Sequence, residues 1–314
     1  MTAPGDRDFA DLTEPFRREL LAHCYRMSGS VDEAEDLVQE TYLRAWRSYE
    51  GFEGRSSLRV WLYRIATNTC LTALKGRGRR PLPSGLGPPS DDPGAEPVMG
   101  GDVPWVEPLP DALLDPATIA ASRETLRLAL IAGLQYLPAR QRAVLILREV
   151  LGFRATEVAA MLGTSTAAVK STLQRARARL DEVAPSTDRM EPFDPRHRDL
   201  LDAYMAAIEN ADLAALERAL HKDVILQMPP SRTWFAGLDT CLDYLRGVLG
   251  SPGDWRMVPT AANGRPAAAA YLRDATGVHR SAGVIVLDTT ANGIAGITFF
   301  GTAGAFALPA TLPP

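Results

Sequence analysis

Three side chains at helical spacing have the chemistry to bind a single strand of nucleic acid. Trp61, Arg64 and Asn68 stand at i, i+3 and i+7, so we expect them to line one flank of a helix. An aromatic ring stacks on an exposed base, an amide reads a base edge, and a guanidinium neutralises a phosphate. The next residues, 69–80, contain four basic side chains and no acidic one. Taken alone, Trp61 fits a buried core position at least as well.

A second polar group follows about a hundred residues later. Residues 155–180 predict a helix, a tight turn and a second helix, with Gly163 as the left-handed turn residue and Ser165 or Thr166 as the cap. Polar side chains are expected to face outward on the second helix: Lys170, Ser171, Gln174, Arg175 and Arg177. A recognition helix uses such positions to reach base edges and phosphates in the major groove. A generic three-helix core is the alternative.

Helices must position the first group as well. Ser56 or Ser57 can cap a helix that carries residues 61–68. The stretch before it, 34–47, has helical periodicity, with an apolar face and a polar face. The polar face carries Asp36, Gln39, Glu40, Leu43 and Arg47. From its pattern alone, such a face on a surface helix is normally a solvated one.

The net charge argues against nucleic-acid binding, but its distribution does not. The chain has 314 residues, of which 46% are hydrophobic and 23% charged, and its net charge is −4. Successive segments carry −6 (1–54), +7 (55–80), −7 (81–118), +5 (119–183) and −3 (184–314). Because salt screens exposed charges beyond about 10 Å, the two basic blocks act locally. Solvated surface faces are the alternative explanation.

Proline and glycine divide the chain. Residues 81–118 hold 10 of the 24 prolines and five glycines, so we expect an extended, partly disordered acidic linker. Within it, Trp105 is expected to dock on another part of the chain, because an isolated indole would leave a large apolar surface wet. A second break is expected at 184–195. The expected domains are therefore 9–80, 119–183 and 195–310.

Several classes of protein are disfavoured. Cys24, Cys70 and Cys241 show no CxxC pairing, so we expect neither a disulfide framework nor a zinc site, and no cofactor. The sequence has no run of about 18 apolar residues, and residues 1–8 lack the pattern of a secretory signal. We therefore expect a cytoplasmic protein.

Three motifs resemble those of one protein family and occur in the order in which that family carries them. They are DEAEDLVQET at 32–41, WLYRIATN at 61–68 and LPARQRAVL at 137–145. Together they are similar to group 4, or extracytoplasmic-function, sigma factors of the sigma-70 family. Residues 9–80 resemble sigma region 2, and residues 119–183 resemble the helix-turn-helix region 4. The resemblance implies binding of core RNA polymerase, at its β′ clamp and β flap, and of promoter DNA.

The resemblance also implies a role for each matching residue. The polymerase-binding positions are Asp36, Gln39 and Glu40. The positions for the minus-ten element are Phe52, Arg55, Ser56, Trp61, Arg64 and Asn68, with loop 54–57 as the pocket for a flipped base. The minus-thirty-five positions are Lys170, Ser171, Gln174, Arg175 and Arg177. Family members often carry an aromatic residue where Gln174 stands, and the acidic linker replaces region 3 of larger sigma factors.

The last segment predicts two helices followed by strands. The helices are expected at 195–210 and 212–220, and the strands at 224–228, 267–272, 283–287 and 294–300, with a turn at Asn292-Gly293. The runs at 221–230, 234–237 and 262–266 are similar to SnoaL-like domains of the NTF2-like superfamily. We therefore expect a multidomain chain with two all-α sigma domains and an α+β cone with a curved antiparallel sheet. The cone is expected to regulate the sigma domains in cis.

Catalysis is not expected in this last domain. Its candidate acids and bases form no recognisable triad or carboxylate pair: His221, Asp223, Asp239, Asp274 and His279. Five apolar side chains fit either a core or the lining of a pocket for an unknown small ligand: Met228, Trp234, Phe235, Tyr271 and Phe299. Two alternatives stay open. One is a SnoaL-type enzyme or ligand sensor fused to a DNA-binding regulator, and the other is a helix-turn-helix regulator that never contacts polymerase.

Overall fold

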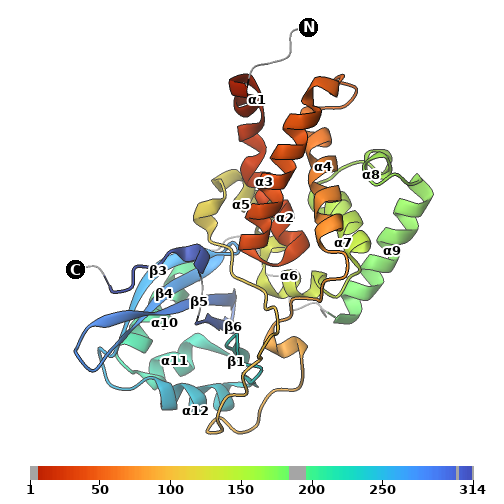
Figure 1. Cartoon of the computed structure of the whole chain (residues 1–314). Helices are drawn as coiled ribbons and strands as arrows, with labels where there is room; N and C mark the ends of the chain where they lie inside the picture. The colour runs from red at the N-terminus through yellow and green to blue at the C-terminus, as the bar shows by residue number, and fades with distance from the viewer. Residues whose placement is uncertain (1–5, 184–195, 302–303, 313–314) are drawn as a thin grey trace. The chain divides into compact units, whose positions relative to one another are not determined.

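The computed structural model describes residues 6–183, 196–301 and 304–312 (Figure 1). These residues form two compact units. The first unit joins the N-terminal segment, up to Arg80, with the segment that begins at Ala112. The second unit joins Pro81–Asp111 with the C-terminal segment. The break expected at 184–195 lies outside the described residues.

The first unit is helical, as the sequence predicts. Its helices are α1 (Asp6–Thr13), α2 (Arg17–Ser28), α3 (Val31–Ser48), α4 (Leu58–Ala73), α5 (Pro116–Leu126), α6 (Leu128–Leu134), α7 (Ala139–Leu145), α8 (Ala155–Met161) and α9 (Thr166–Val183). Helices α2, α3 and α4 pack side by side (Figure 1). Across the described part of the chain, no helix combines the length and apolarity that a membrane crossing needs.

Helix α3 begins where the sequence supplies a stop and a cap. Gly29 ends α2 in a left-handed conformation, with φ of 76°. The Ser30 hydroxyl then accepts a hydrogen bond from the Glu33 N–H at 3.3 Å. The predicted apolar face of α3 is confirmed, because its members are buried: Ala34, Leu37, Val38, Thr41 and Ala45.

A neutral histidine lies in the core between α2 and α4. His23 is fully buried, and its Nε2 lies 3.1 Å from the hydroxyl oxygen of Thr67. Burial, reinforced by the positive charge of Arg26, lowers the pKa of His23 to about 3. The imidazole is therefore uncharged in the folded protein at neutral pH.

A buried guanidinium joins the two helical segments of the first unit. Arg142 of α7 is only 6% exposed. It donates to the carbonyl of Met27 at the end of α2, and to Gln135 Oε1 at 2.6 Å. It also donates to the backbone carbonyls of Gln135 and Leu137, each at 3.2 Å. Burial lowers the pKa of Arg142 to about 10, so it stays charged at neutral pH and is held by carbonyl oxygens.

A second contact between these segments is aromatic. The guanidinium of Arg59 on α4 lies 4.9 Å from the ring centroids of both Tyr63 and Phe153. The rings of Tyr63 and Phe153 meet edge to face at 5.2 Å. The Glu19 carboxylate accepts a hydrogen bond from Arg59 Nε at 3.0 Å. The loop before α8 is thus packed onto α4.

The second unit is an α+β domain. Its elements are α10 (Arg196–Glu209), α11 (Leu213–Ala219), β1 (Leu220–Gln227), β2 (Trp234–Ala236), α12 (Leu238–Val248), β3 (Trp255–Ala262), β4 (Arg265–Arg273), β5 (His279–Thr290) and β6 (Gly293–Phe300). The strands form one sheet in the order β2-β1-β6-β5-β4-β3. With the helical first unit, this domain confirms the fold class expected from the sequence.

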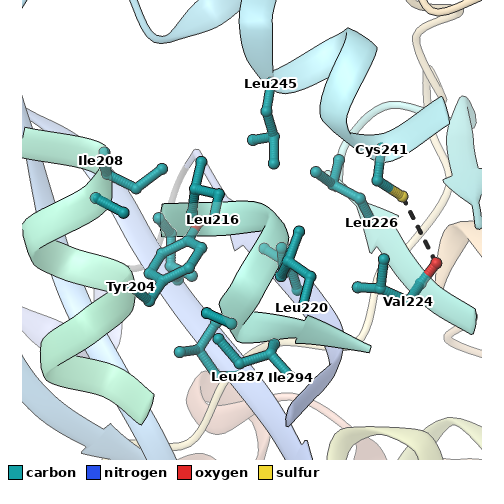
Figure 2. Close-up of a cluster of buried hydrophobic side chains, with 14 of the residues drawn as sticks. Tyr204, Ile208, Leu216, Leu220, Val224, Leu226, Cys241, Leu245, Leu287 and Ile294 are labelled. Carbon is teal, nitrogen blue, oxygen red and sulfur yellow. Dashed lines mark hydrogen bonds between the residues drawn. The ribbon is translucent and has the colours of Figure 1, made fainter. Parts of the chain in front are cut away.

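The core of the second unit lies between the sheet and its helices. Figure 2 shows Tyr204 and Ile208 of α10 pointing into this core with Leu226 of β1 and Leu245 of α12. The Cys241 thiol, also buried, donates to the Val224 carbonyl at 3.6 Å. All three cysteines of the chain are free and buried.

Three details of the sheet differ from the prediction. The sheet is mixed, because β1 pairs with β6 in parallel. Strand β2, helix α12 and strand β3 were not expected. Strand β2 has only three residues and β3 contains Pro259, so both give weak periodicity, whereas α12 is amphipathic and its pattern was overlooked. The hairpin between β5 and β6 turns at residues 291–292, since Thr290 pairs with Gly293. The turn predicted at Asn292-Gly293 is therefore one residue too late.

The proline-rich linker is ordered against the second unit. The Ser84 N–H donates to Gln227 Oε1 at 3.3 Å, and the Val98 N–H donates to the Thr233 hydroxyl at 2.8 Å. Leu109 exchanges two hydrogen bonds with Asn263, both of 2.8 Å. The expectation of a partly disordered linker is wrong for this segment. Its backbone groups, which proline keeps out of helices, bond to the edges and loops of the sheet instead.

The neutral His23 predicts a specific pH dependence of stability. The unfolded chain binds a proton at His23 near pH 6.5, but the folded chain does so only near pH 3. Stability must therefore fall as the pH drops through this window, by about 2 kcal/mol between pH 7 and pH 5 from this residue. We expect His23→Gln to remove that part of the loss, as measured by urea unfolding at both pH values. An equal loss in variant and wild type would contradict a buried neutral imidazole.

Candidate nucleic-acid interface

The flank of α4 that was expected to bind a single strand is only partly exposed. Arg64 and Asn68 are exposed. Trp61 is 5% exposed, so its expected place on an open flank is wrong. Its ring packs against Phe52 at 4.9 Å and against Tyr49 at 6.1 Å. Burial of the large apolar ring outweighs its use as an exposed stacking platform.

The loop before α4 presents a half-buried ring and two exposed polar residues. Phe52 is half-buried and packs on Trp61, and the ring of Tyr49, which also contacts Trp61, stacks with that of Phe52 at 6.2 Å. Arg55 and Ser56 are exposed, and Arg55 Nε pairs with the Glu53 carboxylate at 3.1 Å. Exposed pairs of this kind contribute little to stability, so Arg55 remains available to an anion. Ser57, not Ser56, caps α4 by accepting from the Val60 N–H at 3.3 Å.

Both amide hydrogens of Asn68 are engaged within the first unit. Asn68 Nδ2 donates to the carbonyl of Arg64 at 2.7 Å, one turn back on α4. It also donates to the carbonyl of Met161 at 3.1 Å, at the end of α8. A side-chain amide has two donor hydrogens. Asn68 can therefore donate to a base edge only after one of these contacts opens.

The basic run after α4 is partly neutralised. Arg77 and Arg80 both pair with Glu33 of α3, Arg80 at 2.9 Å. The Arg79 guanidinium lies 4.3 Å from the ring centroid of Tyr136. The sequence showed no acid near this run, because Glu33 comes from a helix more than forty residues earlier. Fewer charges are free for phosphates than the sequence suggests.

The predicted helix-turn-helix is formed by α8 and α9. Gly163 has φ of 58° in the turn, as expected. Ser165 is the residue that caps α9, by accepting from the Ala168 N–H at 3.1 Å. Val169 and Ala176 are buried on the inner side of α9, and Leu173 and Leu180 are half-buried.

The polar residues expected on α9 all face solvent. The exposed set is Lys170, Ser171, Gln174, Arg175 and Arg177. Arg177 pairs with Glu149, and Arg175 Nη2 donates to the Thr172 hydroxyl at 3.2 Å. The set lies along one exposed side of an 18-residue helix, with its basic groups able to reach an anionic surface.

Helix α3 presents its polar face opposite the buried one. Asp36 and Gln39 are exposed, and Glu40 is partly exposed. Arg44 Nε donates to Glu40 Oε1 at 2.6 Å, one turn further on. Trp46, at 51% exposure, adds a large apolar side chain near the end of the same helix. Acidic and apolar groups together are suited to a protein partner.

Trp105 lies within the linker's contact with the second unit. Its half-buried ring packs so closely on Gly100 that a Cβ at that position would clash with it. The Gly100 N–H donates to the carbonyl of Pro230 at 2.7 Å. Glycine is therefore needed here for close approach of the indole and the Pro230 loop.

The five candidate acids and bases of the second unit do not form a site. His221 Nδ1 accepts from the Asp223 N–H at 3.2 Å. Hydrogen bonds from Thr276 and Arg280 hold the pKa of Asp274 below its usual range. His279 Nε2 lies 3.0 Å from the Gly253 carbonyl, and Asp239 lies in the first turn of α12. Among the described residues, no group of His, Cys, Asp and Glu side chains could hold a metal ion.

Sequence reasoning missed the residues that join the two helical segments. Arg142, Arg59 and Phe153 meet partners that are far away in the sequence. Only the two arginines had a signal in the sequence, because they lie inside apolar helix patterns. A cation that is buried at such a position must have hydrogen-bond acceptors nearby.

Comparison with known proteins assigns the class of the first unit. Residues 12–80 match the family model for Sigma-70 region 2, and residues 127–180 match the model for Sigma-70 region 4. The chain is therefore a sigma-70-type protein with the two promoter-related regions in the expected order.

Similarity that extends beyond these two regions narrows the class. The chain is 53% identical over 300 residues to the ECF RNA polymerase sigma factor SigG of Mycobacterium tuberculosis, covering 93% of this chain and 81% of that protein. It is 32% identical over 212 residues to SigJ of the same organism, covering 67% and 62%. The chain belongs to the extracytoplasmic-function (ECF) RNA polymerase sigma factors.

A solved structure has the same overall fold. The crystal structure of the Mycobacterium tuberculosis ECF sigma factor SigJ aligns with a TM-score of 0.61 at 23% identity, covering 95% of this chain and 98% of that one. At this identity the likeness concerns the fold.

Proposed function

We propose that this chain is a promoter-selecting subunit of RNA polymerase whose third domain regulates it in cis. It binds core polymerase, opens and reads the minus-ten element with region 2, and docks region 4 on the minus-thirty-five element. The observation that carries the proposal is the exposed polar side of α9, together with the exposed Arg55, Ser56 and Arg64 at α4, in a chain of the ECF family. A regulator that never contacts polymerase is disfavoured by that membership.

The polymerase contact is assigned to α3. Asp36, Gln39 and Glu40 form an exposed polar face that the helix does not need for its own packing. We assign this face to the β′ clamp, and a contact of region 4 with the β flap belongs to the same proposal. The acidic charge of residues 1–54 favours basic partner surfaces.

The minus-ten contact is assigned to the loop before α4 and to α4 itself. Phe52, half-buried over Trp61, supplies a ring on which a flipped base stacks, and Trp61 supports that ring from below. Arg55, Ser56 and Arg64 are exposed for the backbone and base edges. Asn68 reads a base after releasing the Met161 carbonyl, so promoter melting and separation of α8 from α4 are coupled.

The minus-thirty-five contact is assigned to α9. Its outward polar residues fit base edges and phosphates in the major groove: Lys170, Ser171, Gln174, Arg175 and Arg177. At position 174 an aromatic side chain is common in the family, but this chain has a glutamine. The amide of Gln174 suits hydrogen bonding to adenine.

Regulation in cis is assigned to the linker. The segment Pro81–Asp111 connects region 2 to region 4 but is hydrogen-bonded to the third domain. Holding or releasing it changes how far the two regions can separate. We assign no catalytic role to this domain, because its candidate acids and bases are dispersed. A small ligand in its interior and a cytoplasmic location complete the proposal.

Charge reversal on α3 tests the polymerase contact. We expect Asp36→Arg to reduce co-purification of core polymerase at least tenfold, because a like charge at an interface costs several kcal/mol. The matched control is Glu217→Arg, a charge reversal at another exposed acidic residue, on α11, which should leave co-purification unchanged. Undiminished polymerase binding by the Asp36 variant would remove the basis of the assignment.

Loosening the linker tests regulation in cis. Asn263→Gly keeps the left-handed backbone (φ 56°) but removes the acceptor for the Leu109 N–H. We expect a Glu-specific protease to cleave after Glu96 and Glu107 about tenfold faster, since an unpaired donor costs about 1–3 kcal/mol. The yield of transcript from a cognate promoter should change at least twofold. Faster cleavage with an unchanged yield would refute regulation through the linker.

A further inference from the structure

The interior of the second unit contains an apolar cavity. Its volume is about 180 Å³, and it is bounded by α10, α12 and the inner face of the sheet. Aromatic side chains from four elements line it: Tyr204, Tyr244, Trp255 and Phe299. Two thioethers, of Met228 and Met257, complete its polarisable lining. Val248 both lines the cavity and is 40% exposed, so the cavity reaches solvent beside it.

One polar side chain in this lining forms no hydrogen bond to a described residue. Tyr204 is 1% exposed, and its hydroxyl makes no hydrogen bond to any described residue. Burial raises the pKa of Tyr204, so the phenol stays neutral and can both donate and accept. By contrast, Trp255 Nε1 donates to the Val248 carbonyl at 3.1 Å. Because Tyr204 lines the cavity and its hydroxyl makes no bond to a described residue, the hydroxyl is available to a polar group of a molecule bound there.

The lining also selects against charge. It contains no Asp, Glu, His, Lys or Arg side chain. An ion in this cavity would lose its hydration without gaining a counter-charge, which is strongly unfavourable. The candidate acids and bases of the domain lie outside the lining, so the cavity has the means to bind but not to transform a molecule.

Size narrows the class of ligand further. An apolar cavity of about 150 Å³ stays dry and accepts one benzene molecule, so this cavity holds a single ring with a small substituent. Aromatic rings and thioethers favour a flat aromatic ligand. We propose that the second unit binds a small, neutral, single-ring aromatic molecule of the phenol class, whose polar group pairs with the Tyr204 hydroxyl. This inference rests on the part of the proposed function that gives the third domain a small ligand.

Calorimetric titration of the full chain with phenol, benzene and benzoate tests the proposal. We expect phenol to bind with a Kd below about 1 mM, a value well within the efficiency that small ligands reach. Phenol should bind about threefold to tenfold tighter than benzene, because one additional hydrogen bond is made. Benzoate, which has the same ring but a negative charge, should bind at least tenfold more weakly than phenol.

Two matched variants locate the hydrogen bond. Tyr204→Phe keeps the ring and removes the hydroxyl, so the preference for phenol over benzene should disappear while benzene still binds. Tyr271→Phe makes the same change at a buried tyrosine outside the lining and should keep the preference. The proposal is overturned if neither phenol nor benzene binds, if benzoate binds as tightly as phenol, or if both variants give the same preference. Ligand binding and co-purification of polymerase are separate measurements, so the ligand proposal can fail while the proposed function in transcription stands.

Discussion

A buried positive charge that must be surrounded by oxygen atoms determines how the first unit is built. Arg142 reaches from α7 to the carbonyl at the end of α2, and the side chain and backbone of Gln135 with the backbone carbonyl of Leu137 complete its shell. Removing the guanidinium would leave these acceptors unpaired, at about 1–3 kcal/mol each. The pairing therefore requires region 4 to pack on region 2, and with it the Arg59–Phe153 contact.

This packing affects the residues assigned to promoter DNA. The side of α9 that is assigned to the minus-thirty-five element is exposed within this packing. Asn68 is different, because the same packing brings the Met161 carbonyl to its amide. In the second unit the linker is ordered through bonds such as those between Leu109 and Asn263. In the proposed function, reading of promoter DNA by Asn68 depends on release of its bond to the Met161 carbonyl.

The sequence predicted the features that neighbouring residues determine and missed the contacts between residues that are far apart in the sequence. The buried face of α3, the Gly163 turn and the outward side of α9 follow from periodicity and capping within a few residues. Trp61 was placed on an open flank because nothing nearby in sequence shows that Phe52 and Tyr49 cover it. The order in the linker was missed for a related reason. Its composition excludes regular structure, but its hydrogen-bond partners lie more than a hundred residues away.

The most direct test of the account is promoter opening by core polymerase and this chain, followed by 2-aminopurine fluorescence in the minus-ten element. A base contact by a side-chain amide is worth about 1–3 kcal/mol, so Asn68→Ala should slow opening about tenfold without loss of polymerase binding. Asn210→Ala is the control, because Asn210 makes the same bond to the carbonyl one turn back, at 2.8 Å, and should open the promoter like wild type. Opening by Asn68→Ala at the wild-type rate would contradict the account.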